Sequence, residues 1–351
     1  MLEAQESNFK QARKPLDTNL SGKLEKTECV LLERICTAYN LALENGAADG
    51  VYGPTSWWRR VGTKYLEPAR DALRSGDIVR LHSMYSRFYR NTCSSGLIRQ
   101  PPMYGSDGFM ELCEASCKAM REDMLYRIGY WRTETGGRYP ISALGAPEVG
   151  MPLGISVDSV FVAVGAEYQH ACADRIRRLA GNGGTVAELG GGFGNMAYFL
   201  LGMNSSFTYV GFDVPESLAL CAYYLGQSRP ERKLFLYGEQ ERWRDLVSDI
   251  VLMPTSEMQN LPNASVDVTF SSHLLADLDP ASLEAYAREI ARFSRRYIVN
   301  VTIEDSPEQR KRQLRTLAKQ LKLIETRLWN WNIHRAPKAQ EWEDVYKAVR
   351  S

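Results

Sequence analysis

The sequence predicts an α/β protein in which a doubly wound parallel sheet follows a mainly helical N-terminal half. Apolar and charged residues alternate at helical spacing over about the first 135 positions, whereas from position 185 onward short apolar strands alternate with amphipathic helices. An alternating order of this kind favours a parallel sheet with helices on both faces. The length of 351 residues, with 44% hydrophobic and 24% charged residues, is ample for a buried core.

The N-terminal half is expected to contain several helices. Loop sequences at Asn45-Gly46, Gly53-Pro54, Ser94-Ser95-Gly96 and Pro101-Pro102 divide it into at least four. Residues 135–154 are too rich in glycine and proline for a regular element. We therefore expect two domains, a helical one over residues 1–155 and a sheet-containing one over residues 156–351.

The second half can be assigned element by element. One amphipathic helix is predicted from Val160 to the glycine cluster that begins at Gly181, because apolar residues recur there every three or four positions. Strands are expected over residues 185–189, 207–212, 250–253, 266–271 and 297–301. Helices are expected from about Asn195, after Pro215 and after Pro280. A helix near 307–321, a strand near 323–331 and a short terminal helix complete the chain, and residues 234–237 form either a further strand or a helix extension.

Charge and hydropathy exclude several classes of partner. Lys and Arg total 43 and Asp and Glu total 42, so the formal net charge of +1 is far from that of a dedicated nucleic-acid-binding protein. No apolar run approaches the roughly 18 residues that span a bilayer, and the acidic residues within positions 1–6 are unlike a signal peptide. We therefore expect a cytoplasmic protein that binds neither nucleic acid nor membrane, and a homodimer is possible.

The cysteines indicate neither disulfides nor a metal site. The seven of them include no Cys-x-x-Cys pair, and Cys113 and Cys117, four residues apart, have no histidine near them in sequence as a further ligand. Asp277 and Asp279 could bind a divalent cation, but Asp279-Pro280 is also typical of a helix start. We expect reduced, mostly buried thiols and no metal.

A glycine-rich turn follows the first strand of the second half. Glycines stand at positions 190, 192 and 194, where they permit positive φ and let a ligand approach the backbone. The next strand ends in Asp213, whose carboxylate can accept hydrogen bonds from both hydroxyls of a ribose. Together, these features predict a nucleoside ligand.

The spacing of this turn distinguishes between classes of nucleotide. A dinucleotide fingerprint needs a further glycine three residues on, but Asn195 and Ala197 occupy the corresponding positions, and no P-loop lysine is present. Glu188, just before the turn, would repel a pyrophosphate and attract a cation such as an α-ammonium group. Glu188, the three glycines and Asp213 resemble the first motif and the second-strand acid of class I S-adenosylmethionine-dependent methyltransferases. The resemblance implies a Rossmann-like methyltransferase core and S-adenosyl-L-methionine as the cofactor.

Further segments extend this resemblance. Residues 260–268 are similar to the superfamily's segment before the fourth strand, which implies that Glu257 and Met258 lie beside the adenine. Ser271 and Tyr168 are assigned to the cofactor site as well. Residues 148–154, with the helix after them, resemble the sugar O-methyltransferase family, which implies that residues 1–155 form a lid and acceptor pocket. The run 271–277 departs from the polar sequence that this family has after the fourth strand.

Methyl transfer to a hydroxyl also needs a group that removes a proton. His273 is the first choice for this base, because it is the histidine that directly follows a core strand, at the edge where open α/β sheets bind ligands; a structural histidine is the alternative. Asp277 is the second candidate. His170 is expected to be exposed, nothing selects His82, and His334 could reach the substrate from the C-terminal segment.

Other residues have more than one interpretation. Aromatic side chains in the first half, together with Tyr168, could line an acceptor pocket, although core packing is the commoner role; they are Trp57, Trp58, Tyr85, Phe88 and Tyr89. The nearby basic residues Arg59, Arg60 and Lys64 are expected on a solvated helix face.

The sequence thus favours a methyltransferase for a small polar acceptor, with a sugar or glycoside hydroxyl as the first choice. An amine or guanidino nitrogen of an amino-acid-like metabolite is the alternative acceptor, in which case Glu167, Glu257 and Asp277 could hold its positive charge. A non-catalytic, nucleoside-binding partner protein is the remaining alternative.

Overall fold

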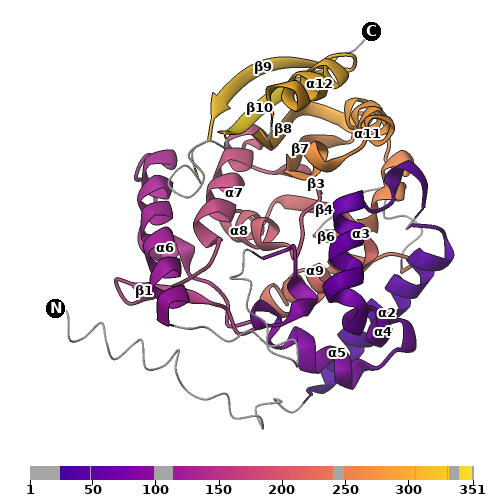
Figure 1. Ribbon diagram of the computed structural model, residues 1–351, viewed down its shortest axis with the longest axis vertical. Coiled ribbons are helices and arrows are strands. Elements are labelled where there is room, and N and C mark those ends of the chain that lie inside the picture. The colour runs from indigo at the N-terminus through magenta and orange to yellow at the C-terminus, as the bar shows by residue number, and fades with distance from the viewer. Residues whose placement is uncertain are drawn as a thin grey trace.

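An eight-stranded sheet forms the centre of the computed structural model (Figure 1). Its strand order is β5-β6-β4-β3-β7-β8-β10-β9. The strand bounds are β3 Gly184–Leu189, β4 Phe207–Asp213, β5 Leu234–Leu236, β6 Ile250–Pro254, β7 Val266–Ser272, β8 Ser294–Glu304, β9 Leu321–Leu328 and β10 Gln340–Ala348. Neighbouring strands from β5 to β8 pair in parallel, and β10 pairs antiparallel with both β8 and β9. The predicted doubly wound α/β core is therefore confirmed, and the hairpin of β9 and β10 completes it.

The structure describes residues 24–47, 49–98, 114–239, 249–304, 306–329, 331 and 340–349. The predicted break at Pro101-Pro102, together with Cys113 and His334, lies outside these residues. In the described part of the chain, no helix has both the length and the apolar character needed to cross a membrane.

The strand order creates a crevice at the centre of the sheet. From β3 the chain runs to β4 and then β6 on one side, and it returns across β3 to β7 and β8 on the other. The connections after β3 and β7 therefore leave the sheet in opposite directions. In open α/β sheets, ligands bind outside the carboxyl ends of the strands at such a switch point.

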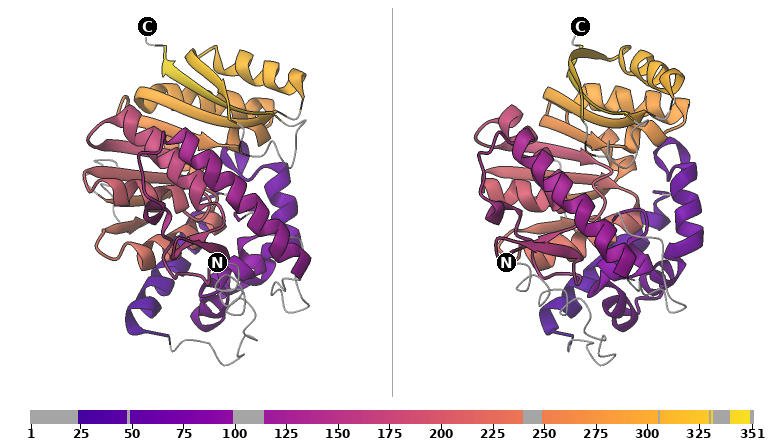
Figure 2. Two further views of the ribbon diagram at one scale, coloured as in Figure 1. Left: turned by 90° about the vertical axis from the view of Figure 1, so that its left-hand side faces the viewer. Right: turned by 60° about the vertical axis from the view of Figure 1, so that its left-hand side comes forward.

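Helices cover both faces of the sheet (Figure 2). The helices of the second half are α7 Ala166–Ala180, α8 Asn195–Met203, α9 Pro215–Ser228, α10 Leu274–Asp277, α11 Pro280–Phe293 and α12 Pro307–Leu317, with the short 3₁₀ helix η7 at Thr255–Asn260. Alternate strand residues face opposite cores. Val186 and Tyr209 belong to the core with α7, α8 and α9, whereas Ala187 and Val210 belong to the core with α11.

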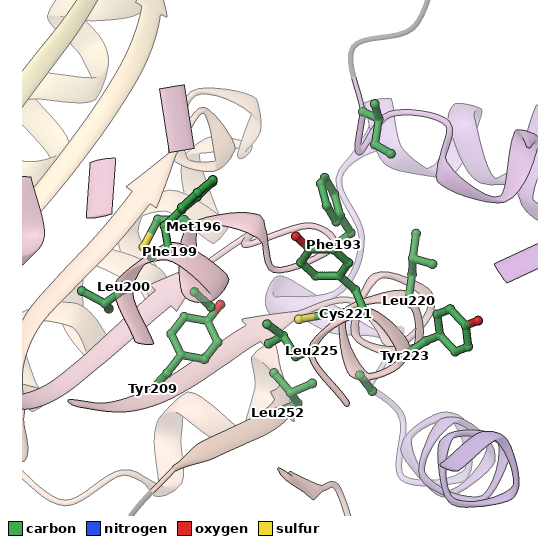
Figure 3. Packing of buried hydrophobic residues seen from close by; sticks show 14 of the residues in the cluster. Phe193, Met196, Phe199, Leu200, Tyr209, Leu220, Cys221, Tyr223, Leu225 and Leu252 are labelled. Atoms are coloured by element: carbon green, nitrogen blue, oxygen red, sulfur yellow. The ribbon is translucent and has the colours of Figure 1, made fainter. Parts of the chain in front are cut away.

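The first core continues into the N-terminal half. This half contributes α2 Lys26–Glu44, α3 Ser56–Val61, α4 Glu67–Ser75, α5 Ile78–Tyr85 and α6 Glu114–Glu134, which confirms its helical character. Buried residues of α2 and α5, among them Ile35 and Leu81, share one cluster with α9. Figure 3 shows Cys221 and Leu225 of α9 beside Leu252 of β6 in this core. The helices therefore pack directly onto the sheet domain.

The single helix predicted from Val160 is wrong in its first part. Val160–Ala163 forms strand β2, which pairs antiparallel with β1 (Gly154–Val157). Asp158 and Ser159 join the two strands with φ of 50° and 66°, the positive values that a two-residue hairpin turn requires. Gly165, with φ of 86°, then separates the hairpin from α7. The apolar residues of β2 happened to continue the helical spacing of α7.

The short terminal helix is also wrong, because Gln340–Ala348 forms β10. This strand contains acids that resemble an exposed helix face in sequence but are buried in the sheet. Glu343 contacts Arg175 and Arg327, and Asp344 contacts Arg310. The arginines come from α7, β9 and α12, so the local sequence could not reveal them. The ambiguous segment near Leu234 forms the edge strand β5.

Candidate active site

A cavity of about 500 Å³ lies at the carboxyl ends of the central strands. The sheet contributes Glu188 from β3, Asp213 from β4 and Ser272 from β7 to its wall. The N-terminal half covers the opposite side with residues of α3, the loop after η4 (Thr92–Ser94) and α6, and Figure 1 shows α3 beside the central strands. The crevice expected from the strand order is therefore a real pocket, and both halves of the chain enclose it.

The glycine turn forms one edge of this cavity. Gly190, Gly192 and Gly194 have φ of 74°, 59° and 88°, a region that glycine adopts without strain. The backbone N–H of Gly190 donates to Phe212 O at 2.9 Å, which holds the turn against the end of β4. Gly194 is the N-cap of α8 and lies outside the cavity wall, where a Cβ would meet Cys221 Sγ at 2.7 Å. Gly190 and Gly192 line the cavity, while Gly194 serves the packing of α8 against α9.

Two carboxyl groups lie in the same wall. The Tyr209 hydroxyl donates to Glu188 Oε2 at 2.6 Å. The backbone N–H groups of Gly192 and Val214 donate to Asp213 at 3.0 and 2.7 Å. Burial and, to a smaller extent, the Asp213 charge raise the pKa of Glu188 to about 7, against the opposing effect of the Tyr209 hydrogen bond. Burial likewise raises the pKa of Asp213 to about 7, against the two backbone hydrogen bonds. A ligand that brings positive charge or hydroxyl donors would stabilise the ionised form of both carboxyl groups.

His273 lies in the cavity wall and makes several contacts. Its Nε2 is 2.8 Å from Glu341 Oε1, and its Nδ1 is 3.3 Å from Ser272 Oγ. The Ser272 hydroxyl is in turn 2.7 Å from the Tyr168 hydroxyl. The ring is stacked on that of Tyr168, with centroids 6.2 Å apart. The structure therefore brings together two residues assigned from the sequence, His273 and Tyr168, with two that were not, Ser272 and Glu341.

The remaining assigned residues are divided between the wall and the core. Asp277 lines the cavity at the end of α10. Met258 is fully buried in the core of the other face, and Glu257, beside it on η7, accepts a hydrogen bond from Asn260 at 2.9 Å. Ser271 is buried one residue before the wall residue Ser272. Neither Glu257, Met258 nor Ser271 lines the cavity in this structure.

The sequence did not single out several wall residues. Arg127 of α6 reaches the cavity while its Nε donates to the fully buried Glu167. Ser217 of α9 lines the cavity beside Asp213, and its buried hydroxyl lowers the pKa of Asp213 through a side-chain hydrogen bond. Trp58, by contrast, is one of the aromatic residues considered in the sequence; it lines the cavity, and its ring nitrogen donates to Glu216 at 2.9 Å. Ser217 could have been found from the sequence, because it follows the end of β4 by only a few residues. Nothing in the sequence around Arg127 indicates that it lies at the cavity.

His170 is buried, contrary to the exposure predicted from its helix. Only 2% of it is exposed, because α6 packs onto α7 and the Trp131 ring nitrogen donates to His170 Nδ1 at 3.1 Å. Burial lowers the pKa of His170 to about 4, so its ring is neutral. His82 is also buried, near Glu28. Neither histidine lines the cavity. Arg59, Arg60 and Lys64 are exposed, as predicted.

Comparisons with known proteins give likenesses of fold and no close relative. No protein-family model matches the chain, and no curated protein matches its sequence. Many solved structures resemble it in fold, among them the following three. The [4+2]-cyclase SpnF has 12% identity and a TM-score of 0.41, over 66% of this chain and 97% of that one. The N-methyltransferase NodS from Bradyrhizobium japonicum, in complex with S-adenosyl-L-homocysteine, has 12% identity and a TM-score of 0.37, over 53% and 88%. Geranyl diphosphate C-methyltransferase from Streptomyces coelicolor has 14% identity and a TM-score of 0.35, over 51% and 76%.

Proposed function

We propose that this chain is an S-adenosylmethionine-dependent methyltransferase that acts on a small polar molecule. The observation that carries the proposal is the pair of carboxyl groups, Glu188 and Asp213, in one cavity beside the glycine turn. Asp213 stands at the end of the second strand of the core, where a carboxylate can accept hydrogen bonds from a ribose. The carboxylate of Glu188 attracts positive charge. A cationic nucleoside could therefore interact favourably with both groups.

The cavity wall fits this cofactor chemically. The Ser217 hydroxyl beside Asp213 adds a buried polar group to the cavity wall that a ligand could contact. A Cβ at Gly190 would lie 3.0 Å from Leu274 Cβ, and one at Gly192 would lie 3.6 Å from Leu97 Cδ2. Side chains there would occupy space that glycines leave open. These features support a nucleoside held between the glycine turn and the end of β4.

The chain's own residues would then hold the ligands and move a proton. The bound cofactor supplies an electrophilic methyl group. Asp213 and Glu188 would hold its polar ends, and Trp57 and Leu97 add apolar surface to the cavity wall. His273 accepts the proton of the acceptor, because a neutral imidazole is the usual base near neutral pH. This arrangement aligns the reactants and removes the proton, as a methyl transfer to oxygen requires.

A hydroxyl acceptor is favoured over an amine or guanidino group. Of the three acids that could hold a cationic acceptor, Glu167 is fully buried against Arg127, and Glu257 lies outside the cavity wall. Asp277 remains in the wall, with His273. We therefore keep a hydroxyl, first that of a sugar or glycoside, as the proposed acceptor, and nitrogen as the alternative. A small-molecule acceptor, a homodimer and a cytoplasmic location stay predictions from the sequence.

Calorimetric titration with S-adenosylmethionine tests the cofactor site. Asp213→Ala should weaken binding at least tenfold, because a charge-assisted hydrogen bond contributes about 1.5–3 kcal/mol. Asp279→Ala is the control, since Asp279 caps α11 through the N–H groups of Ala281 and Ser282 and is not a wall residue. It should cost stability and leave affinity unchanged. Binding by Asp213→Ala within twofold of wild type contradicts the assignment.

Mass spectrometry then tests catalysis and the acceptor. The protein is incubated with S-adenosylmethionine and a panel of sugars, glycosides and amino-acid amines, and each product is examined for the mass of one added methyl group. Methylation of a hydroxyl supports the proposal, and methylation of an amine supports the alternative. Cofactor binding without turnover of any acceptor favours the non-catalytic alternative.

A further inference from the structure

Glu341 is a buried carboxylate at the edge of the proposed acceptor site. It is the second residue of β10, and its position is fixed by pairing with Ile303 of β8, itself a wall residue of the cavity. Only 4% of Glu341 is exposed, and its backbone oxygen accepts from the Trp329 N–H at 2.6 Å. Its side chain ends 2.8 Å from His273 Nε2. The C-terminal hairpin therefore delivers one acidic group to the histidine.

The backbone and ring of His273 are held on other sides as well. Its φ is 69°, and its backbone N–H donates to Val301 O at 2.8 Å. The ring planes of Tyr168 and His273 differ by 15°. A non-glycine residue in the left-handed region is uncommon and is often a functional position. The ring thus has a defined orientation between Glu341 and Ser272.

This orientation decides which nitrogen can accept a proton. An ionised carboxylate only accepts hydrogen bonds, so the contact with Glu341 places the neutral ring's proton on Nε2. The lone pair of Nδ1 then faces the Ser272 hydroxyl, on the same side as the Tyr168 hydroxyl. Both hydroxyls belong to wall residues. The accepting nitrogen therefore lies on the side of the ring where these two wall residues stand, away from Glu341.

We propose that Glu341 is the positioning residue that makes His273 Nδ1 the base for a hydroxyl acceptor, an inference that rests on the proposed function. The acceptor's proton passes to Nδ1, and its oxygen lone pair forms the new bond to the methyl group. The electron pair of the broken carbon–sulfur bond stays on sulfur, which leaves S-adenosylhomocysteine. Glu341 stabilises the imidazolium until the proton returns to solvent. In this arrangement the carboxylate of Glu341 orients the His273 ring through a hydrogen bond, and the ring acts as the base.

Other ionisable groups stand on the elements around the histidine. Tyr168 of α7 is stacked on its ring, Asp277 follows four residues later on α10, and Arg127 of α6 lies over the Tyr168 ring at 5.9 Å. Burial raises the pKa of the Tyr168 hydroxyl well above its ordinary value, so Tyr168 stays neutral near pH 7. Glu341 is the carboxylate that touches the ring directly.

Kinetics of three variants test the role. Glu341→Gln keeps the shape of the side chain but removes its charge, and we expect kcat to fall about 10- to 100-fold, part of the loss usual for general-base catalysis, with cofactor affinity unchanged. The acidic limb of the pH–rate profile should move to lower pH, because the imidazolium loses its counter-charge. Glu341→Asp restores the charge and should recover part of the rate. The control is Glu325→Gln, at a half-exposed residue of β9 that contacts Arg175. It should change neither kcat nor the acidic limb of the pH–rate profile.

Two further measurements separate this inference from the proposed function and from a folding defect. In a double-mutant cycle, Glu341→Gln should cost no further rate once His273 is replaced by alanine. NMR titration of the His273 ring in the full-length protein needs no turnover, and Glu341→Gln should move its midpoint to lower pH. If the wild type transfers methyl groups and Glu341→Gln has the same kcat, pH profile and His273 titration midpoint as the wild type, the inference is overturned. The proposed function is then left intact. If Glu341→Gln moves the His273 midpoint but the wild type transfers no methyl group, the proposed function is contradicted. The role of His273 as a base is then contradicted as well.

Discussion

Gly190 meets two requirements at once, a positive φ and space beside Leu274. Its φ of 74° costs a side-chain-bearing residue about 1–2 kcal/mol. In addition, a Cβ there would lie 3.0 Å from the Leu274 Cβ, at the cavity edge. The sequence predicted the first requirement from the motif, and the structure adds the second.

Gly190→Val should therefore abolish detectable S-adenosylmethionine binding, because the side chain displaces Leu274 into the cavity and strains the turn. Gly76→Val is the matched control: Gly76 has φ of 67° at the end of α4, and a Cβ there would meet no atom within 4 Å. Both variants should lose about 1–2 kcal/mol of stability, measured by urea unfolding. Only Gly190→Val should lose binding by calorimetry, and equal affinities in the two variants contradict the role of the turn.

The hairpin of β1 and β2 shows how one element can conceal another in sequence. Its second strand continues the apolar spacing of α7, so the pattern alone predicted one helix. Backbone contact in the hairpin is close, since a Cβ on Gly154 would lie 2.0 Å from Val162 O. Glycine at this position lets the two strands approach.

Gly154→Ala should lower the free energy of unfolding by more than about 2 kcal/mol, since the backbone must move to admit a methyl group. Gly129→Ala is the opposite case, because Gly129 lies inside α6, where a Cβ would meet nothing within 4 Å. That change should raise stability by about 0.5–1 kcal/mol, the usual gain of alanine over glycine in a helix. Thermal and urea unfolding measure both. If Gly154→Ala is as stable as wild type, the pairing of β1 with β2 is wrong.

For the whole molecule, the cavity acids Glu188, which is buried, and Asp213, which is half-buried, connect stability with pH. Both carboxyl groups have a pKa raised to about 7 in the folded chain, whereas in an unfolded chain they titrate near 4. Between these values the folded state binds more protons than the unfolded state. Their contribution to the free energy of unfolding therefore falls as pH rises from about 4 to 7.

Urea unfolding of the ligand-free protein at a series of pH values checks this linkage. Relative to the wild type, Glu188→Gln and Asp213→Asn should become progressively more stable as pH rises from 5 to 8, by on the order of 2 kcal/mol for each removed acid. Comparing each variant with the wild type cancels the contributions of the acids that do not interact with the replaced group. If the free energies of unfolding of variant and wild type differ by a constant amount from pH 5 to pH 8, the raised pKa values are contradicted.

Local sequence signals were enough to predict the central sheet, most of its helices and the edge of the sheet that carries the cavity. Strand periodicity, Pro215 and Pro280 at helix starts, and the glycines at 190–194 are local signals, since each depends on backbone geometry within a few residues. For the same reason Glu188, Asp213 and His273 could be assigned from their places at strand ends. All three do line one cavity.

Tertiary structure decided what these residues touch. Glu341 is 68 positions from His273 in the chain, and its strand was predicted as a helix, because buried acids resemble exposed ones until their partners are known. The burial of His170 depends on α6, and the exclusion of Met258 from the cavity depends on the packing of η7. Such contacts join residues far apart in the chain, and the physical reason that sequence could not supply them is that burial and pairing are properties of the packed molecule.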